Sequence, residues 1–186
     1  MSRPETVVYI ATTVDGFIAR PDGGLDWLEH DAGGEDYGWQ AFRDGLDGLV
    51  LGRNTYEQVL SFGVPWPYKG LNTVVWSRTL TTADLPAALR DEGVEVSALP
   101  PADLLGRLGD RGLRRVWIDG GQTVQAFLAA GLVDLLTLTR IPILIGAGVP
   151  LFGPLPADGQ LSHLQTVSFA SGVVQSAYSV RALASP

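Results

Sequence analysis

The residues best suited to chemistry lie where a predicted strand gives way to a predicted helix near position 52. Leu49–Leu51 is a short apolar run typical of a buried strand, Gly52 follows as a turn, and Arg53 and Thr55 open a helical pattern. Because a helix start presents unpaired backbone N–H groups and the positive end of the helix dipole, this junction is suited to bind a phosphate of a nucleotide cofactor. The alternative is that Gly52 is only a turn and Arg53 only a solvated neighbour of the helix cap.

A second junction of the same kind is the pair Gly120 and Gly121. A strand pattern enters the pair, and a helix pattern leaves it from Gln122 or Thr123. Residues without side chains allow the backbone to approach a ligand closely, so a pyrophosphate lying across this helix start would account for them. A tight strand-to-helix turn is the alternative explanation.

Ser77 and Arg78 come directly after a further predicted strand that ends at Trp76. The carboxyl ends of parallel strands share one rim of a sheet, so both residues are expected to meet Arg53 and the glycine pair there. Two arginines at one site can grip a phosphate, such as the 2′-phosphate of NADPH. The sequence therefore predicts one nucleotide site instead of three unrelated loops.

Another glycine-containing segment, residues 145–153, looks superficially like a dinucleotide-binding fingerprint. Pro150 and Pro154 prevent a regular helix from following it, so no helix start would face a pyrophosphate. We expect a loop between C-terminal strands.

The elements that must position these residues alternate between strands and helices. The predicted strands are Thr6–Thr13, Leu49–Leu51, Leu71–Trp76, Val94–Ser97 and Arg115–Ile118, and the predicted helices are Gly38–Gly45, Ala102–Leu108, Thr123–Ala130 and one from Arg53. This alternation predicts an α/β fold with parallel pairing in one sheet. Leu132–Ile141 is also strand-like, and His163–Phe169 with Val173–Arg181 predicts a hairpin, so the C-terminal strands are expected to run antiparallel at one edge.

Composition excludes several classes of function. The 186 residues, 46% of them apolar, suffice for one domain over residues 1–186. The absence of cysteine excludes disulfides and thiolate zinc sites, and the spacing of the two histidines predicts no metal site. A net charge of −7 with Lys69 as the only lysine argues against a nucleic-acid partner. No apolar stretch approaches the ~20 residues of a membrane span, so we expect a cytoplasmic protein.

These motifs together resemble the dihydrofolate reductase-like family, and within it the branch related to the reductase domain of riboflavin biosynthesis. The matching segments follow the family's order over most of the chain and are residues 13–19, 26–28, 52–57, 77–78, 119–121 and 142–152. The resemblance implies a three-layer fold, with a mixed, mostly parallel sheet, antiparallel C-terminal strands and helices on both faces. It also implies a reductase similar to dihydrofolate reductase or to 5-amino-6-(5-phosphoribosylamino)uracil reductase, with NADPH as cofactor and commonly a homodimer.

The resemblance also carries roles over to individual residues. It implies that the cofactor is bound at its phosphates and pyrophosphate by Gly52, Arg53, Thr55, Ser77, Arg78, Gly120, Gly121, Gln122 and Thr123.

The substrate side depends on carboxylates and aromatic residues near the N-terminus. Asp15 ends the first strand on the cofactor rim, where it can hydrogen-bond a substrate or position the nicotinamide; an ordinary Asp-Gly turn is the alternative. Residues 21–42 contain six carboxylates and no Lys or Arg. By the family's order Asp36 begins the acidic substrate-binding helix, and Trp27 and Trp39 are expected to contact the substrate.

We expect direct hydride transfer from NADPH to a C=N or C=O bond of a small pterin- or pyrimidine-like heterocycle. Asp36, Asp15 or an ordered water would donate the proton; burial of Asp36 would raise its pKa, whereas a helix-capping role would not require it. A wall of carboxylates without cations is poorly suited to a ribose phosphate, unless basic residues from another loop, such as Lys69 or Arg140, supply the missing charge. The alternatives are a nucleotide-binding protein without turnover and a structural dimer module.

The prediction of a homodimer has only indirect support in the residues. Leu135–Leu151 is strongly apolar for a segment that ends at a sheet edge, and such edges tend to be covered or paired. A core strand explains the same residues without a partner.

Overall fold

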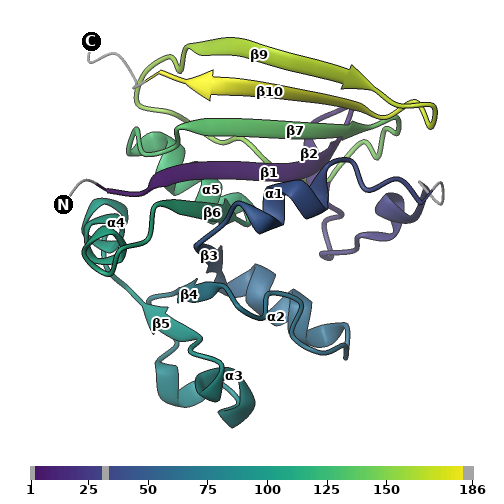
Figure 1. Ribbon diagram of the computed structural model, residues 1–186. Coiled ribbons are helices and arrows are strands. Elements are labelled where there is room, and N and C mark those ends of the chain that lie inside the picture. Colours follow the sequence, from purple (N-terminus) through teal and green to yellow (C-terminus); the bar gives the residue numbers. More distant parts are fainter. Residues whose placement is uncertain (1–2, 31–33, 182–186) are drawn as a thin grey trace.

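The computed structural model describes residues 3–30 and 34–181, which form one α/β domain around an eight-stranded sheet (Figure 1). The strand order is β5-β4-β3-β6-β1-β7-β10-β9. The bounds are β1 (Glu5–Thr13), β3 (Gly48–Gly52), β4 (Asn72–Trp76), β5 (Glu95–Ser97), β6 (Arg115–Asp119), β7 (Leu135–Ile141), β9 (Leu161–Ser168) and β10 (Val174–Val180).

The pairing of the strands confirms the predicted mixed sheet. β1 pairs parallel with β6 and β7, β3 pairs parallel with β4 and β6, and β4 pairs parallel with β5. β10 runs antiparallel to β7, and β9 runs antiparallel to β10. The parallel strands therefore all end at one rim, where the predicted nucleotide site was expected.

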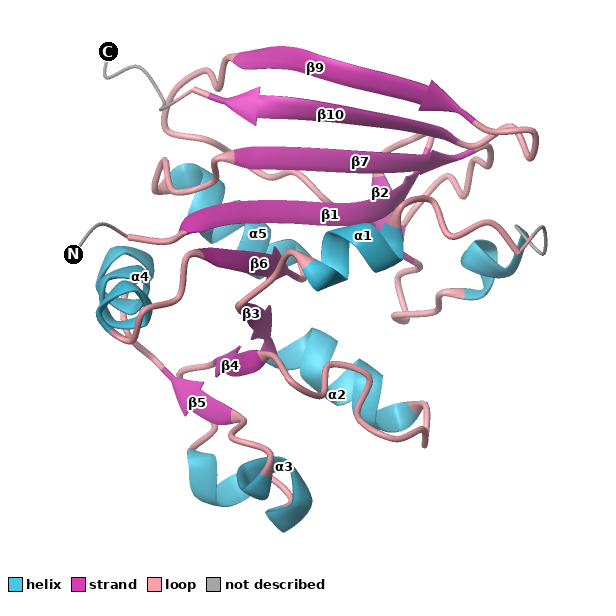
Figure 2. Ribbon diagram, viewed as in Figure 1, coloured by secondary structure: helices cyan, strands magenta, loops and turns pink. Residues whose placement is uncertain are grey.

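Helices cover both faces of the sheet, as Figure 2 shows. Their bounds are α1 (Trp39–Asp44), α2 (Arg53–Ser61), α3 (Ala87–Asp91), α4 (Pro101–Asp110) and α5 (Gly121–Ala129), with short 3-10 helices at Asp26–His30 and Thr82–Asp84. The predicted three-layer arrangement is confirmed.

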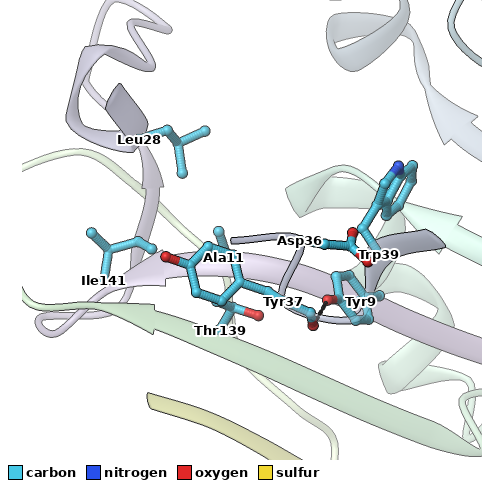
Figure 3. Close-up of a pocket in the computed structure, with 8 residues that line it drawn as sticks. All are labelled: Tyr9, Ala11, Leu28, Asp36, Tyr37, Trp39, Thr139 and Ile141. Carbon is cyan, nitrogen blue, oxygen red and sulfur yellow. Dashed lines mark hydrogen bonds between the residues drawn. The ribbon is translucent and has the colours of Figure 1, made fainter. Parts of the chain in front are cut away.

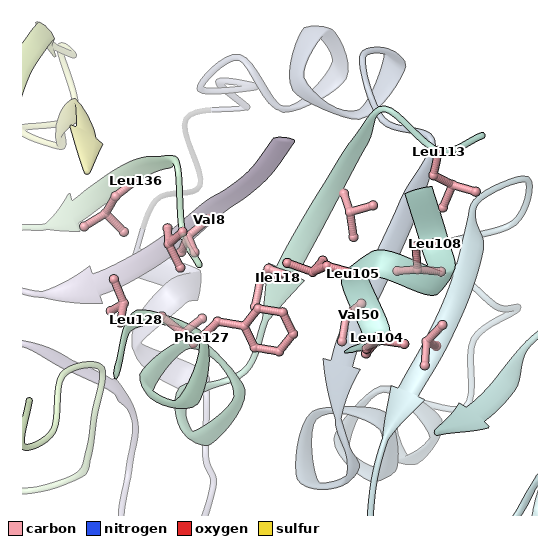
Figure 4. Close-up of a cluster of buried hydrophobic side chains, with 14 of the residues drawn as sticks. Val8, Val50, Leu104, Leu105, Leu108, Leu113, Ile118, Phe127, Leu128 and Leu136 are labelled. Atoms are coloured by element: carbon pink, nitrogen blue, oxygen red, sulfur yellow. The ribbon is translucent and has the colours of Figure 1, made fainter. Parts of the chain in front are cut away.

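Alternation along β1 explains why both faces are covered. Val7 and Val8 are each 1% exposed, and because successive side chains point to opposite faces they belong to different hydrophobic clusters. Val8 packs on the side of α4 and α5, with Leu105 and Phe127 among its cluster (Figure 4). Val7 packs on the opposite side, in the cluster of Tyr56 from α2. Burial of this kind contributes about 1.5–3 kcal/mol for each large apolar side chain.

Two features of the fold differ from the expectations. β7 is an interior strand between β1 and β10, so the apolar character of this strand reflects the core and not an exposed edge. The edge strands of the sheet are β9 and β5. The short elements β2 (Phe17–Ala19), β8 (Val149–Pro150) and α3 were not expected, because runs of two to five residues carry too little periodicity to be recognised.

Candidate functional site

The starts of α2 and α5 face each other at the ends of the neighbouring strands β3 and β6. A Cβ atom added to Gly52 would lie 2.5 Å from the Oγ1 atom of Thr123, and one added to Gly120 would overlap the side chain of Thr55. Gly120 also has a φ of 91°, which L side chains rarely adopt. The two glycines therefore let each helix start close against the other.

Both helix starts lack the groups that usually satisfy them. Neither α2 nor α5 has a side-chain cap, and neither has an acidic residue in its first turn. Their first-turn N–H groups remain for an external acceptor, and their dipole ends keep a partial positive charge. Two such ends side by side can bind a group with two negative centres, such as a pyrophosphate.

Arginine side chains lie beside this pair of helix starts. Arg53 donates from Nε to Glu57 Oε1 at 2.7 Å and from Nη1 to Thr79 Oγ1 at 3.0 Å, so its guanidinium is oriented by two partners. Arg78 is exposed, and within residues 3–30 and 34–181 it makes no hydrogen bond or ion pair. Arg78 is thus the freer of the two cations, and Arg53 would have to share its donors with any phosphate.

Ser77 is turned inward. It is 8% exposed, and its Oγ accepts the backbone N–H groups of Thr79 at 3.2 Å and Leu80 at 3.1 Å. Its hydroxyl therefore shapes the turn that presents Arg78, and its contribution to a phosphate site would be indirect.

Gly121 lies beneath a small ribbon made by β2 and β8, which pair antiparallel. A Cβ atom on Gly121 would lie 2.8 Å from Ile18 Cδ1 and 3.6 Å from the carbonyl oxygen of Pro150. Gln122, the next residue, is exposed. Of the residues expected at the pyrophosphate, Gly121 therefore shapes the packing around the helix start, whereas Gln122 is open to solvent.

Asp15 fastens the loops that carry this ribbon. Its carboxylate accepts the backbone N–H groups of Gly146 at 2.8 Å and Ile145 at 3.2 Å. The Thr13 hydroxyl and these N–H groups lower the pKa of Asp15. A carboxyl group kept ionised is a poor proton donor at neutral pH, so these contacts favour a loop-fastening role for Asp15. Its expected hydrogen bond to a substrate or to the nicotinamide stays a prediction.

A cavity of about 260 Å³ opens on the α1 side of the sheet (Figure 3). It is lined by Tyr9, Ala11, Leu28, Asp36, Tyr37, Trp39, Thr139 and Ile141. The strand residues among them lie between the middle and the carboxyl ends of β1 and β7, so the cavity opens toward the same rim as the two helix starts. Asp36 is the single charged residue of this lining.

Gln175 of β10 holds the polar wall of this cavity. Its Nε2 lies 2.9 Å from Tyr9 Oη, 3.0 Å from the Tyr37 carbonyl oxygen and 2.9 Å from Thr139 Oγ1. Tyr9 Oη also donates to the Tyr37 carbonyl at 2.5 Å. Tyr37 has a φ of 50°, a left-handed conformation that is strained for a side chain of this size. The network therefore holds Tyr37 in place, and with it the adjacent Asp36.

Two of the predicted substrate-side residues are placed differently from the expectation. Asp36 is exposed, and its two carboxylate oxygens lie 3.1 and 3.3 Å from the backbone nitrogen of Gln40, so the capping alternative describes its contact. Trp27 is 2% exposed and packs with Ile141 and Val173, so its ring belongs to a hydrophobic cluster and Leu28 lines the cavity instead. Trp39 does line the cavity.

Sequence reasoning assigned no role to Asp119, which ends β6 directly before the glycine pair. Burial raises its pKa to about 6, although the Gly120 N–H opposes this shift. The pKa of the nearby Tyr68 is raised as well, mainly by burial of its hydroxyl and to a smaller extent by the charge of Asp119. A carboxyl group that titrates near neutrality can hold or release a proton at physiological pH. The signal in the sequence is a lone carboxylate at the end of the apolar run Val116–Ile118.

Two other kinds of feature, a metal site and a membrane-spanning helix, lack support in the described residues. In the part of the chain that the structure describes, no group of three or more His, Cys, Asp or Glu side chains is arranged to hold a metal ion. Likewise, no helix in that part has the length and apolarity needed to cross a membrane.

Comparison with known proteins places this geometry in a family. The family model described as the RibD C-terminal domain matches residues 4–175. The uncharacterized protein YwjB of Bacillus subtilis (strain 168) is 32% identical over 170 residues, which is 91% of this chain and 94% of that protein. A crystal structure from Shewanella sp. PV-4, named as a candidate riboflavin biosynthesis protein, has a TM-score of 0.89 at 37% identity and covers 95% of this chain and 99% of that chain.

Two more distant relatives are longer proteins. The riboflavin biosynthesis protein RibD of Corynebacterium ammoniagenes is 28% identical over 158 residues, which is 80% of this chain but 46% of that protein. RibD of Acinetobacter baumannii shares the fold, with a TM-score of 0.70 at 17% identity. The chain therefore belongs to the RibD C-terminal domain family, which is related to the reductase domain of RibD.

Proposed function

We propose that this protein is an NADPH-dependent reductase that transfers a hydride to a C=N or C=O bond of a small heterocycle. The observation that carries the proposal is the pair of uncapped helix starts, α2 and α5, at the same rim as the aromatic cavity. Binding a dinucleotide beside a small apolar cavity is the arrangement that a hydride transfer requires, because the cofactor and the substrate must lie in contact.

The residues present fit NADPH in a specific way. The backbone N–H groups that begin α2 and α5 would hold the pyrophosphate, and Arg78, assisted by Arg53, would hold the 2′-phosphate. When bound, NADPH would supply the hydride. The protein would contribute the orientation of the two reactants and the exclusion of water by the β2–β8 ribbon.

A proton must accompany the hydride, and Asp119 is the group best suited to supply it. Its pKa of about 6 keeps a fraction of the carboxyl protonated near neutral pH. Asp119 follows Trp117 on the same face of β6, and Trp117 contacts Trp39 of the cavity wall with ring centroids 5.2 Å apart. Asp36 at the cavity mouth would then orient the substrate instead of protonating it.

One observation favours a second candidate, a nucleotide-binding protein without turnover. Both of the carboxylates first expected to donate a proton are engaged elsewhere, Asp15 with a loop and Asp36 with the α1 backbone. Tight binding of NADPH with no oxidation by any acceptor would identify this alternative.

A titration with NADPH and NADH, followed by tryptophan fluorescence, tests the proposal. We expect NADPH to bind more tightly, and Arg78→Ala to weaken NADPH about 10- to 100-fold while changing NADH little, because a charge-assisted bond to phosphate is worth about 1.5–3 kcal/mol. Arg53→Ala should also weaken NADPH more than NADH.

The matched control is Arg90→Ala, which removes an exposed arginine on α3. If the Arg78 and Arg53 variants lose affinity for NADPH and for NADH to the same extent, the assignment of these arginines to the 2′-phosphate is wrong. Failure of the unmodified protein to bind either nucleotide would overturn the proposed function.

A further inference from the structure

We propose that Gln125 of α5 is a positioning residue for the nicotinamide nucleotide, because it fixes the β2–β8 ribbon over the start of its own helix. The inference rests on the proposed function for the identity of the nucleotide. It adds to that function a reason why the start of α5 stays shaped for a pyrophosphate: the segment that covers this helix start is fastened to the helix itself.

The side-chain amide of Gln125 holds the backbone of β8 and of the residue that follows it. Its Nε2 donates to the carbonyl oxygen of Pro150 at 3.1 Å and to that of Leu151 at 3.2 Å. Its other side lies against Gly153, where an added Cβ atom would be 2.7 Å from Gln125 Oε1. An amide nitrogen carries two hydrogens, so both donors of Gln125 are used to hold this part of the chain.

This contact lies directly beside the start of α5. Gln125 comes one helical turn after Gly121, so the two residues lie on the same face of the helix. The Pro150 carbonyl oxygen that Gln125 binds is also 3.6 Å from the place that a Cβ atom of Gly121 would take. A shift of β8 must therefore change the space beside the first-turn N–H groups of α5, which are the groups proposed to hold the pyrophosphate.

The other contacts of the ribbon fasten it to the end of β1 instead of to α5. Asp15 accepts the Gly146 N–H at 2.8 Å, and the Leu151 N–H donates to the Gly16 carbonyl oxygen at 3.1 Å. Among the residues that the structure describes, Gln125 makes the only side-chain hydrogen bonds between α5 and this ribbon. Removing its amide should therefore loosen the ribbon at the helix and leave its contacts with β1 intact.

The part of the nucleotide that a loosened ribbon would affect is the pyrophosphate, which NADPH and NADH share. The 2′-phosphate belongs to NADPH alone and is assigned to Arg78 and Arg53. Loss of the Gln125 amide should therefore weaken NADPH and NADH by the same factor, whereas loss of Arg78 should weaken NADPH selectively.

Gln125→Met tests the inference, because it keeps the length of the side chain and a good helix former while it removes both donors. Amide hydrogen exchange of the ligand-free protein reports on the ribbon without any nucleotide. We expect exchange at residues 149 and 151 to become about 5- to 30-fold faster, while exchange in β10 is unchanged. Titration followed by tryptophan fluorescence should show NADPH and NADH both weakened about 3- to 10-fold.

A second variant and a matched control accompany this one. Gly153→Ala should push the Gln125 amide away from the Pro150 and Leu151 carbonyl oxygens and so reproduce both effects. Gln58→Met makes the same substitution on α2, where the side-chain amide has no hydrogen bond among the described residues. It should change neither the exchange of the ribbon nor the affinity for either nucleotide.

Three results in Gln125→Met would overturn the inference: unchanged exchange in the ribbon, exchange that is accelerated equally in β10, or a loss of affinity for NADPH alone. These results are distinct from failure of the proposed function. If the unmodified protein binds neither nucleotide, the proposed function fails. If it binds both and Gln125→Met binds them equally well, the proposed function stands and the positioning role of Gln125 is wrong.

Discussion

At the scale of single residues, the three carboxyl groups of the site lie in three different environments. Asp15 has a lowered pKa because donors surround it, and Asp36 is exposed at the cavity mouth. Asp119 has a pKa raised to about 6 by burial. Groups with environments that push their pKa values apart commonly take different roles in one mechanism. This contrast is why we propose Asp119 as the acid in place of the two carboxylates first expected to act in that role.

The raised pKa of Asp119 predicts a pH dependence of stability. Above its unfolded pKa of about 3.9 the unfolded carboxyl is charged while the folded one still binds a proton, so the free energy of unfolding should fall as pH rises from about 4 to about 6 and then level off. Asp119→Asn cannot ionise and should escape this loss, which is on the order of 2 kcal/mol once partial solvent exposure is allowed for.

Urea unfolding of both proteins at pH 4.5 and 7.5 measures this effect. We expect the variant to gain much more stability relative to the unmodified protein at pH 7.5 than at pH 4.5. A difference between the two proteins that is the same at both pH values would contradict the raised pKa of Asp119.

At the scale of elements, the site depends on the close approach of the α2 and α5 starts. Gly52 and Gly120 are the contact points, each facing a threonine of the other helix. This close contact explains why both positions are glycine, without reference to a ligand. It also explains why the two helix starts lie together, with their unpaired N–H groups directed at the same space. Packing and anion binding thus have a common cause.

Gly120→Ala should therefore lower the free energy of unfolding by about 2–4 kcal/mol. The substitution adds backbone strain at a φ of 91° and an overlap with the Thr55 side chain. Adding Thr55→Ala to the Gly120→Ala variant should restore the part of the lost free energy of unfolding that comes from the overlap. The part that comes from backbone strain should remain lost.

Gly106→Ala is the matched control, because a Cβ atom at this α4 position has no neighbour within 4 Å. It should be neutral or stabilising by about 0.5–1 kcal/mol. Chemical denaturation compares the variants, and equal effects of Gly106→Ala and Gly120→Ala would show that the close approach of the helices is unimportant.

At the scale of the whole molecule, β9 is one of the two edge strands of the sheet, and β5 is the other. Leu161 and Leu164 on β9 are 45% and 56% exposed, and an exposed edge strand with apolar side chains is a surface on which chains tend to pair. The homodimer that the family resemblance implies is therefore proposed to use β9, and not the buried β7 to which the apolar run first pointed.

Light scattering on the purified protein should give about twice the chain mass of 19.8 kDa. Leu164→Lys should shift the mass toward that of one chain, because a charge on the edge disfavours pairing. Leu144→Lys, at a loop residue that is 70% exposed, should leave the mass unchanged. A dimer that survives Leu164→Lys would place the interface elsewhere.

The sequence by itself determined the alternation of strands and helices, the mixed sheet and the strand-to-helix junctions at Gly52 and Gly120. These features follow from local periodicity and from glycine, which act over a few residues. The sequence also identified Trp39 and Asp36 as candidate substrate-side residues, because acidic and aromatic residues cluster in one segment.

Only the tertiary structure decided which charges are free and which side chains are buried. Trp27 and Trp39 look alike in the sequence, yet one is in a core cluster and the other lines the cavity. Arg53 and Arg78 likewise differ only through Glu57 and Thr79, which occupy the first of them. The reason is physical: a pKa, a hydrogen-bond partner or a burial depends on atoms brought together from distant parts of the chain, and local sequence patterns do not record these contacts.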